Sequence, residues 1–243
     1  NIIYFAGGNR VETLEAVVKS SSFTVTQIYV ASIETNIESY RLFAQNNGIS
    51  FTIANKKKIL ELFNYRNEEI LLSAGYRFII PETVFSIPPY ALNIHPSLLP
   101  KYKGAYSGFA IIENGERKTG ITAHFLDEGV DTGDIVNQKN IPLNISDTVS
   151  SLGEKVMEIE PNFVLETLMM IRDNNYIRAK QEKMENEVVF NDKRTPKDSE
   201  VNSSLSLGEL VNQIRACDAE RFPAYFMIDN IKVNIRLEFE NEK

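Results

Sequence analysis

Cysteine is almost absent from this chain, and what the sequence lacks excludes several classes of protein. Cys217 is the one cysteine among 243 residues, so neither an internal disulfide nor a thiolate metal site can form. No apolar run approaches the roughly 18 residues of a membrane-spanning helix. Basic residues are in deficit, because 26 Lys and Arg stand against 33 Asp and Glu, a net charge of −7. An acidic chain lacks the broad positive field that attracts a nucleic-acid polymer.

The N-terminal segment also lacks the features of a secretion signal. The first residues, NIIYFAGGNR, contain neither a basic region nor a small-residue cleavage site. The missing initial Met suggests a chain trimmed at its front. Apolar residues make up 43% and charged residues 24%, the composition of an ordinary globular protein. We therefore expect a cytoplasmic protein of one or two domains, with neither a membrane nor a nucleic-acid polymer as partner.

The first half of the chain alternates short apolar runs with amphipathic stretches, as parallel sheets covered by helices do. The run Ile2–Ala6, ended by Gly7-Gly8, is typical of a strand buried on both faces. Further strands are predicted at Gln27–Ala31, Phe51–Ala54 and Ile70–Ala74, and helices after Val11, after the capping-box pair Thr35 and Glu38, and over Lys57–Phe63. This order predicts an α/β fold with right-handed crossovers.

The second half is punctuated by five prolines between Pro81 and Pro100, which exclude a long helix there. In and beyond this segment we predict strands at Ala91–His95, Gly120–Phe125 and Asp134–Ile141, and a helix over Thr148–Asp173 that is kinked or broken at Pro161. A polar connection over Ala179–Ser204 leads to a helix opened by the capping box Ser206 and Glu209, and then to a β-hairpin around Asp229-Asn230. We therefore expect a main domain over 1–180 and a small module over 181–243.

Asn93 and His95 stand at the end of a predicted strand, and their spacing puts both side chains on one face with Ile94 in the core. Pro96 ends the strand at once, and strand ends are where open parallel sheets bind ligands. An amide can stabilise an oxyanion, and an imidazole titrates near neutrality. The pair is thus a candidate catalytic site, although two residues whose hydrogen bonds are satisfied within a loop would show the same sequence.

An acidic loop follows at Asp127–Asp134, where Gly129 and Gly133 mark a tight turn between two strands. Crowded carboxylates raise one another's pKa, which suits proton relay, although solvated acidic loops have the same composition. The alternating ligands of a calcium loop are missing. Earlier in the chain, the turn Gly7–Arg10 offers free N–H groups and a guanidinium to an anion such as phosphate, or is a simple β-α turn. It lacks the full dinucleotide-binding glycine pattern.

The remaining candidates carry weaker signals. His124 alternates with Ala123 and Phe125, so we expect a packed histidine or one that contacts the site residues without reacting itself. A zinc site of His95, His124 and Asp131 is conceivable but has no compact ligand spacing. The G-x-S-x-G motif that carries the nucleophile of many serine hydrolases is absent from the sequence. Phe222, Tyr225 and Phe226 would suit either an aromatic platform for a base or a hydrophobic core.

Two of these segments together resemble the folate-dependent formyltransferases. Asn93–Pro100 (NIHPSLLP) is similar to that family's N-x-H-x-S-L-L-P signature, and Thr119–Ile135 (TGITAHFLDEGVDTGDI) is similar to its second signature, which contains Asp131. The resemblance extends from Ile2 to about Ile145. It implies a Rossmann-like, mostly parallel sheet with helices on both faces, here followed by a small C-terminal helix and β-hairpin module.

The resemblance also implies a reaction. Asn93, His95 and Asp131 would be the catalytic residues, N10-formyltetrahydrofolate the co-substrate and a primary amine the acceptor, with no metal required. Asn93 would donate a hydrogen bond to the oxygen of the tetrahedral intermediate, and Asp131 would orient or charge-balance His95 and hold a relaying water. His95 would either stabilise the same oxygen when protonated or shuttle the amine proton when neutral, and the sequence leaves both roles open.

Binding residues are carried over from the family in the same way. The loops that contact the pterin match Arg77–Ile80 and Leu126–Asp131, which implies Phe78, Ile80, Asp127 and Asp131 as cofactor neighbours. Glycinamide ribonucleotide transformylases hold the substrate phosphate after the first strand, which implies Gly8, Asn9 and Arg10 as phosphate contacts. Lys103 and Tyr106 would line the sugar, and Arg215, Phe222 and Tyr225 would reach a nucleotide base or phosphates, although a structural role suits all five equally well.

The acceptor is predicted from the tail. Methionyl-tRNA formyltransferases carry a larger C-terminal barrel and a basic surface, whereas this acidic chain has a short tail, so we do not expect tRNA. Lys193–Asp198 and Asn212–Ala216 are similar to motifs of tRNA-type and sugar N-formyltransferases, and a short tail with a hairpin is similar to the sugar enzymes. Gly104–Gly108 departs from the tRNA-type pattern, consistent with a different amine.

We therefore expect a homodimeric enzyme that formylates a nucleotide-linked amino sugar, most simply dTDP-4-amino-4,6-dideoxyglucose, for lipopolysaccharide O-antigen or a related glycan. Two enzymatic alternatives stay open, a formyltransferase of the glycinamide ribonucleotide type or one of the methionyl-tRNA type. An alternative of another class is a non-catalytic sensor of folate or nucleotide sugar, although a sensor has no need to keep the residues Asn93, His95 and Asp131.

Overall fold

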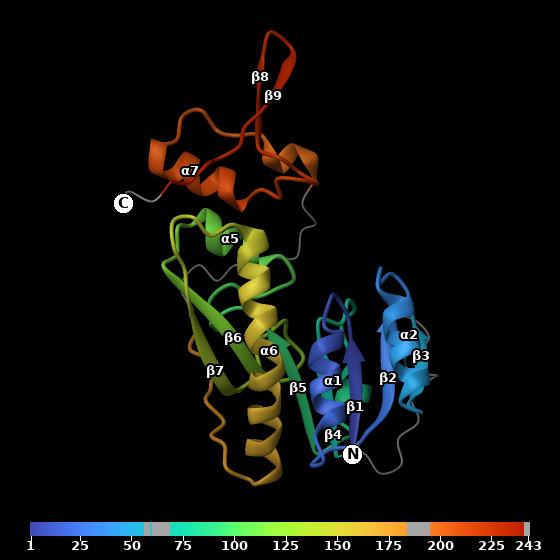
Figure 1. Ribbon diagram of the computed structural model, residues 1–243. Coiled ribbons are helices and arrows are strands. Elements are labelled where there is room, and N and C mark those ends of the chain that lie inside the picture. The colour runs from blue at the N-terminus through green and yellow to red at the C-terminus, as the bar shows by residue number, and fades with distance from the viewer. Residues whose placement is uncertain (56–58, 60–68, 184–194, 241–243) are drawn as a thin grey trace.

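The computed structural model describes residues 1–55, 59, 69–183 and 195–240 (Figure 1). Nearly all of the helix predicted over Lys57–Phe63 lies outside the described residues, as do the first two residues of Lys193–Asp198. Among the described helices, none is both long and apolar enough to cross a membrane.

A seven-stranded sheet in the order β3-β2-β1-β4-β5-β6-β7 forms the centre of the chain. The strands β1 to β5 run parallel, and β6 and β7 continue the sheet antiparallel. The mostly parallel, Rossmann-like α/β sheet predicted from the sequence is confirmed. The strands are β1 (Ile2–Ala6), β2 (Val25–Ala31), β3 (Ser50–Ala54), β4 (Ile70–Ala74), β5 (Tyr90–His95), β6 (Lys118–Phe125) and β7 (Ile135–Pro142).

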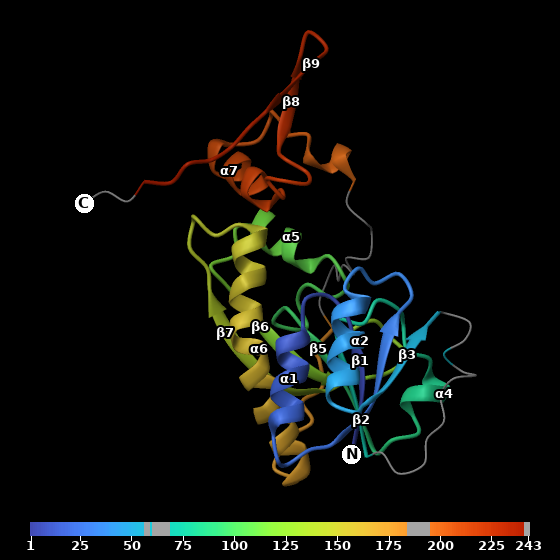
Figure 2. The same ribbon diagram turned by 45° about the vertical axis from the view of Figure 1, so that its right-hand side comes forward.

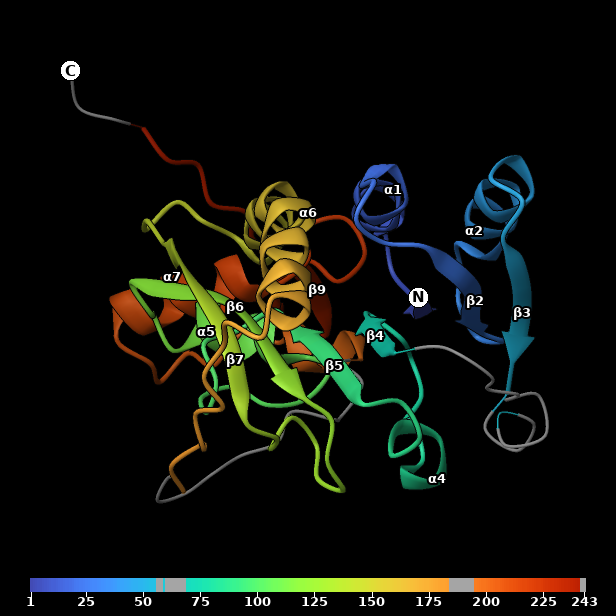
Figure 3. The same cartoon turned by 90° about the horizontal axis from the view of Figure 1, so that it is seen from below.

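Helices lie on both faces of the sheet (Figure 3). One face is covered by α1 (Val11–Lys19), α2 (Ile37–Asn46) and α6 (Val149–Arg172), and α4 (Glu82–Phe85) lies on the other. The alternation along β1 explains this, because Tyr4 packs into the core shared with α1 and α6 while Phe5 packs into the core on the opposite face.

Two local features differ from the predictions. The helix predicted over Thr148–Asp173 is present as α6, but Pro161 does not break it, because buried side chains on both sides of the proline, such as Val156 and Phe163, fix both halves to the sheet. A kink at Pro161 stays a prediction. The helix α2 begins at Ile37, the preceding Asn36 makes no side-chain cap, and Thr35 instead donates its N–H and hydroxyl to Glu34.

Two short helices that the sequence did not predict, α4 and α5 (Ser107–Glu113), lie between β4 and β6, in the part of the chain that contains the five prolines. Helix α5 lies at the top of the sheet, beneath the last part of the chain (Figure 1). It therefore separates the sheet from the C-terminal module.

That C-terminal module consists of a 3₁₀ turn (Pro196–Ser199), α7 (Leu207–Ala216) and the hairpin β8 (Tyr225–Ile228) and β9 (Ile231–Asn234), as Figure 2 shows. The predicted capping box at Ser206 is present, and Asp229 and Asn230 both adopt the left-handed conformation of a tight two-residue turn. The predicted helix and hairpin are confirmed, and the domain boundary near residue 180 stays a prediction.

Candidate active site

The strand β5 ends on Asn93 and His95, which share one face of the sheet as predicted. Their neighbour Ile94 packs on the other face, into the core under α6. His95 is 4% exposed, so its imidazole is almost entirely withdrawn from water. The two side chains thus stand together at the carboxyl edge of the parallel strands.

Asp131 comes from the loop between β6 and β7 and completes the group. Its Oδ2 lies 3.3 Å from Nδ1 of His95 and accepts the N–H of Gly104 at 2.8 Å. Its Oδ1 accepts a hydrogen bond of 3.2 Å from Nδ2 of Asn93. The structure therefore brings together the three residues that the sequence singled out, and their catalytic roles stay a prediction.

His124 joins the same cluster. The antiparallel register pairs it directly with Asn93, so both side chains point to the same face. Its Nε2 lies 3.2 Å from Nδ2 of Asn93 and 3.3 Å from Oδ1 of Asp131, and the residue is 1% exposed. His124 is thus the packed histidine that we expected, and it contacts two of the three candidate catalytic residues.

The two imidazoles have matching hydrogen-bond arrangements. Nε2 of His95 lies 2.8 Å from the carbonyl of Tyr102, and Nδ1 of His124 lies 2.8 Å from the carbonyl of Phe125. A carbonyl only accepts, so each of these nitrogens carries a proton. The other nitrogen of each ring faces an oxygen of Asp131 and becomes a donor to it only when the ring is protonated. The carboxylate of Asp131 therefore lies between two imidazole nitrogens that can each bind a proton, one on His95 and one on His124.

The pKa shifts follow from burial and from these contacts. Burial lowers the pKa of His95, and the charge of Asp131 offsets only part of that effect. Burial alone would raise the pKa of Asp131, but His95, His124 and the Gly104 amide together hold it well below its usual range. Near neutral pH the carboxylate is thus ionised, and the ring of His95 is neutral and able to take up a proton.

Two main-chain contacts in the loop after β5 were not found from the sequence. Tyr102, in the left-handed conformation, supplies the carbonyl to His95, and Gly104 supplies its N–H to Asp131. Lys103 lies between them and is 3% exposed, and Tyr106 is the residue before α5. Main-chain groups belong to every residue type, so no motif marks them.

The predicted cofactor neighbours border the same face of the sheet. Ile80 and Leu126, from the two loops that match the family's pterin contacts, pack against one apolar cluster. Phe78 lies edge-on to Tyr76, and Asp127 is exposed and accepts the hydroxyl of Thr132 at 2.7 Å. Phe78, Ile80, Asp127 and Asp131 stay predicted cofactor neighbours.

The predicted phosphate contacts at Gly8, Asn9 and Arg10 already have internal partners at two positions. The N–H of Gly8 donates to Glu34 at 2.9 Å, and Nε of Arg10 donates to Glu160 at 2.9 Å. Asn9 is exposed. The chain's own carboxylates thus supply anions to two of the groups that were expected to bind one, and a phosphate contact there stays a prediction.

Arg215, Phe222 and Tyr225 belong to the C-terminal module. Arg215 is 3% exposed, and its Nη1 donates to the carbonyls of Asn144 at 3.2 Å and Asp147 at 2.8 Å, just before α6. The carbonyl of Phe222 accepts from Ser199, and the ring of Tyr225 lies under Nζ of Lys232. The contacts of Arg215 therefore join the module to the main sheet.

Arg215→Ala is expected to loosen the C-terminal module. Hydrogen bonds from a charged donor contribute about 1.5–3 kcal/mol each, and this variant removes the donor of two of them. Limited proteolysis should cleave within residues 195–240 faster in the variant than in the wild type. Arg221→Ala, which removes a side chain that is 78% exposed and pairs with Asp218 in the same module, should change the cleavage rate little. Equal cleavage of both variants contradicts the role of Arg215.

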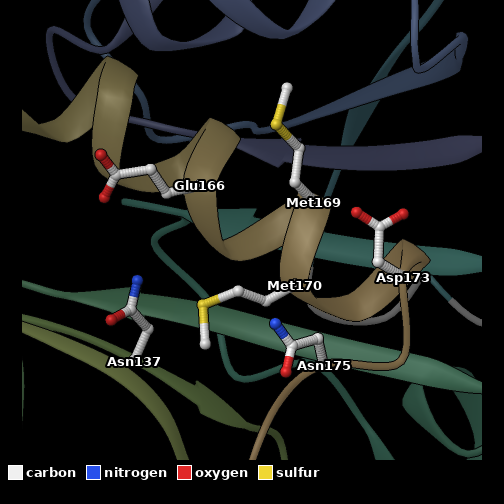
Figure 4. Close-up of a pocket in the computed structure, with 6 residues that line it drawn as sticks. All are labelled: Asn137, Glu166, Met169, Met170, Asp173 and Asn175. Atoms are coloured by element: carbon white, nitrogen blue, oxygen red, sulfur yellow. The ribbon is translucent and has the colours of Figure 1, made fainter.

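A hollow of about 440 Å³ lies elsewhere, between β7 and the end of α6 (Figure 4). It is lined by Asn137, Glu166, Met169, Met170, Asp173 and Asn175. Asn137 pairs with Ala123, which packs into the core under α6, so this hollow opens on the face opposite Asn93 and His95. It takes no part in the cluster around Asp131.

The family described as "Formyl transferase" matches residues 12–168. A methionyl-tRNA formyltransferase of Caldanaerobacter subterraneus subsp. tengcongensis is 34% identical over 131 residues, which cover 54% of this chain and 42% of that protein. The chain spans about half the length of the curated relatives it matches.

Two solved structures are 26% identical to the chain. The sugar 3N-formyl transferase WlaRD, solved in the presence of dTDP and 5-N-formyl-THF, has a TM-score of 0.78 and covers 99% of this chain and 91% of its own. The methionyl-tRNA formyltransferase of Clostridium thermocellum has a TM-score of 0.64 and covers 90% of this chain and 96% of its own.

Proposed function

The chain belongs to the formyl transferase family, and we propose that it moves a formyl group from N10-formyltetrahydrofolate to the primary amine of a dTDP-linked amino sugar. The observation that carries the chemistry is the cluster of Asn93, His95 and Asp131 at the end of β5. The amine nitrogen attacks the formyl carbon, the bond from that carbon to N10 breaks, and one proton passes from the amine to N10. The products are the N-formyl sugar and tetrahydrofolate.

Asn93 stabilises the tetrahedral intermediate in this proposal. The attack places negative charge on the formyl oxygen, and an amide N–H aimed at such an oxygen contributes about 2.7–4 kcal/mol. In the structure the amide nitrogen of Asn93 lies 3.2 Å from Oδ1 of Asp131 and 3.2 Å from Nε2 of His124, so these two contacts hold the amide at the end of β5 before the charge develops. One of its two N–H groups leaves such a contact to reach the formyl oxygen.

His95 acts as the proton shuttle rather than as a charged donor. Its lowered pKa leaves the ring neutral near pH 7, with Nδ1 as the unprotonated nitrogen because Nε2 donates to Tyr102. Nδ1 takes the amine proton, and the imidazolium then lies 3.3 Å from the ionised Asp131. The pKa of Asp131 is too low for it to keep the proton itself, so the proton remains available for N10.

The choice of a sugar acceptor is supported by the extent of the structural likeness. At the same identity of 26%, WlaRD has a TM-score of 0.78 and the methionyl-tRNA enzyme of C. thermocellum one of 0.64. The likeness to WlaRD covers 99% of the chain and therefore includes the helix and hairpin of the C-terminal module. The net charge of −7 also disfavours a nucleic-acid acceptor.

A panel of acceptors tests the proposal. The protein is incubated with N10-formyltetrahydrofolate and, separately, with dTDP-linked 4-amino-4,6-dideoxyglucose, its 3-amino isomer, glycinamide ribonucleotide and methionyl-tRNA. We expect a mass increase of one formyl group, with loss of one hydrogen, on a dTDP sugar. Product on glycinamide ribonucleotide or methionyl-tRNA alone would overturn the acceptor but keep the chemistry. Binding of folate or sugar without any product would favour a sensor.

A further inference from the structure

The segment after α6, which the sequence presents as a polar connection, returns to the candidate site. Ala179 forms an antiparallel bridge with Ile135, with N···O distances of 2.8 and 2.9 Å in the two directions. The guanidinium of Arg178 lies 3.9 Å from the ring centre of Phe125, at the end of β6. These contacts place Gln181 beside the loop that carries Asp131.

Gln181 makes a specific contact with that loop. Its Nε2 donates to the carbonyl of Asp131 at 2.9 Å and to the carbonyl of Gly133 at 2.8 Å. Both acceptors are carbonyls, so the NH₂ end of the amide must face them and its orientation is determined. The other end, Oε1, is buried and has no hydrogen-bond partner among the residues that the structure describes.

The loop needs such a restraint at these two residues. Asp131 adopts a left-handed conformation, with φ of 54°, which a non-glycine residue keeps only when its surroundings hold it there. Gly133 is packed so closely on β6 that a Cβ atom would lie 1.9 Å from the carbonyl oxygen of Phe125. Gln181 therefore joins the carbonyl of Asp131, in its strained conformation, to the carbonyl of Gly133, which packs closely against β6.

We propose that Gln181 is a positioning residue that fixes the carboxylate of Asp131 against His95 and His124 by holding the main chain of its loop. The inference rests on the proposed function for its catalytic consequence, but not for its structural one. Gln181 touches only main-chain carbonyls, so it acts through Asp131 rather than on the substrate. Glutamine donates its two amide hydrogens to the two carbonyls, and neither an acidic nor an apolar side chain can donate both of these hydrogen bonds.

Two variants and one matched control test this assignment. Gln181→Glu keeps the shape but sets a carboxylate against two carbonyls, and Gln181→Met keeps the length without either donor. Gln27→Glu is the control, because Gln27 likewise donates from Nε2 to a carbonyl, that of Ile28, and to the hydroxyl of Thr52, but on β2. All three variants are first compared with the wild type by thermal melting.

The first readout needs no activity, because the chain contains only two histidines and both contact Asp131. NMR titration follows His95, whose charged neighbours are Asp131, His124 and Arg10. The charge of Asp131 favours the protonated ring, so displacing it should move the titration of His95 to lower pH by about half a unit or more in Gln181→Met, the variant that adds no charge. Gln27→Glu should titrate as the wild type does.

The second readout is turnover with the acceptor identified above. A misplaced catalytic group costs up to about 100-fold, so we expect kcat to fall roughly 10- to 100-fold in both Gln181 variants and to stay unchanged in Gln27→Glu. Gln181 variants that fold, titrate and turn over like the wild type overturn the proposal. A shifted titration in a protein that formylates none of the acceptors supports the positioning role and counts against the proposed function alone.

Discussion

Asp131→Asn is expected to lower kcat/KM for formyl transfer by about 1,000-fold while leaving the fold intact. General acid–base assistance contributes roughly 10²–10⁴ to a rate, and the variant removes the charge that stabilises the protonated His95. Asparagine is among the few residues that tolerate the left-handed conformation at this position. Its amide oxygen still accepts the N–H of Gly104, so the loop keeps that contact. Steady-state kinetics with the identified acceptor measure the loss.

The same variant has a predicted signature in the pH dependence. Burial lowers the pKa of His95, and Asp131 counteracts that effect, so removing the carboxylate lowers the pKa of His95 further. The limb of the kcat/KM profile that belongs to His95 should therefore move to lower pH in Asp131→Asn. A limb that moves to higher pH, or that stays in place, is incompatible with the contact between these two groups.

Two comparisons keep this prediction specific. Asp134→Asn changes another acid of the same loop, one paired with Arg178 near the surface, and should alter kcat/KM by less than about threefold. The losses of activity in Asn93→Ala, His95→Ala and Asp131→Ala should combine non-additively. When residues act in one step, removing the first already abolishes most of the rate enhancement that they share, so a second substitution costs little more. Losses that simply multiply in the double and triple variants would count against a shared transition state.

The sheet and the pair Asn93 and His95 were predictable because both depend on local patterns. A continuous apolar run such as Ile2–Ala6 predicts a buried strand, and the alternation of Asn93, Ile94 and His95 places two polar side chains on one face. The capping box at Ser206 and the Asp229-Asn230 turn involve neighbours in sequence, and the structure contains both. The distant partner Asp131 came from the family resemblance, and the strand order was not predicted.

The rest of the site depends on contacts that carry no residue signature. His124 reaches Asn93 only because β6 pairs antiparallel with β5 in one register, and a shift of one residue would turn it to the other face. Tyr102 contributes a carbonyl and Gly104 an N–H, which every residue has. Gln181 stands 50 positions from Asp131, inside a stretch whose composition resembles a linker.

The loop after β1 shows the same limit for electrostatics. Its glycines, N–H groups and Arg10 indicated an anion site, and the structure fills two of those donors from Glu34 and Glu160. Arg77 in turn donates to Glu34 at 3.1 Å. Local sequence specifies donors, but which anion meets them depends on helices and loops far along the chain.

Glu160 is consequently the residue whose loss should destabilise the fold most among the charged groups discussed. It is fully buried on α6, where Oε2 accepts from Arg10 and Oε1 accepts the hydroxyl of Thr13 at 2.9 Å. Arg10 and Thr13 belong to the start of α1, so this carboxylate holds α1 to α6. Glu160→Ala leaves the Arg10 guanidinium, whose side chain is only 14% exposed, without its counter-charge.

Removing one partner of a buried ion pair costs about 3–5 kcal/mol, and we expect Glu160→Ala to lower the free energy of unfolding by that amount. For a chain of this size the melting temperature should fall by roughly 6–20 °C. Glu15→Ala breaks an exposed ion pair with Lys19 on the same helix α1, and should cost no more than about 0.5 kcal/mol. Chemical denaturation of both variants gives the comparison.

The double variant Arg10→Met/Glu160→Met separates charge from packing. Most of the cost of Glu160→Ala comes from stranding a buried charge, so replacing both partners by apolar side chains of similar length should recover a large part of the stability. The double variant should therefore be more stable than Glu160→Ala, although it lacks both charged groups. A double variant less stable than Glu160→Ala would mean that the pair itself, rather than the avoidance of an unpaired Arg10, holds α1 against α6.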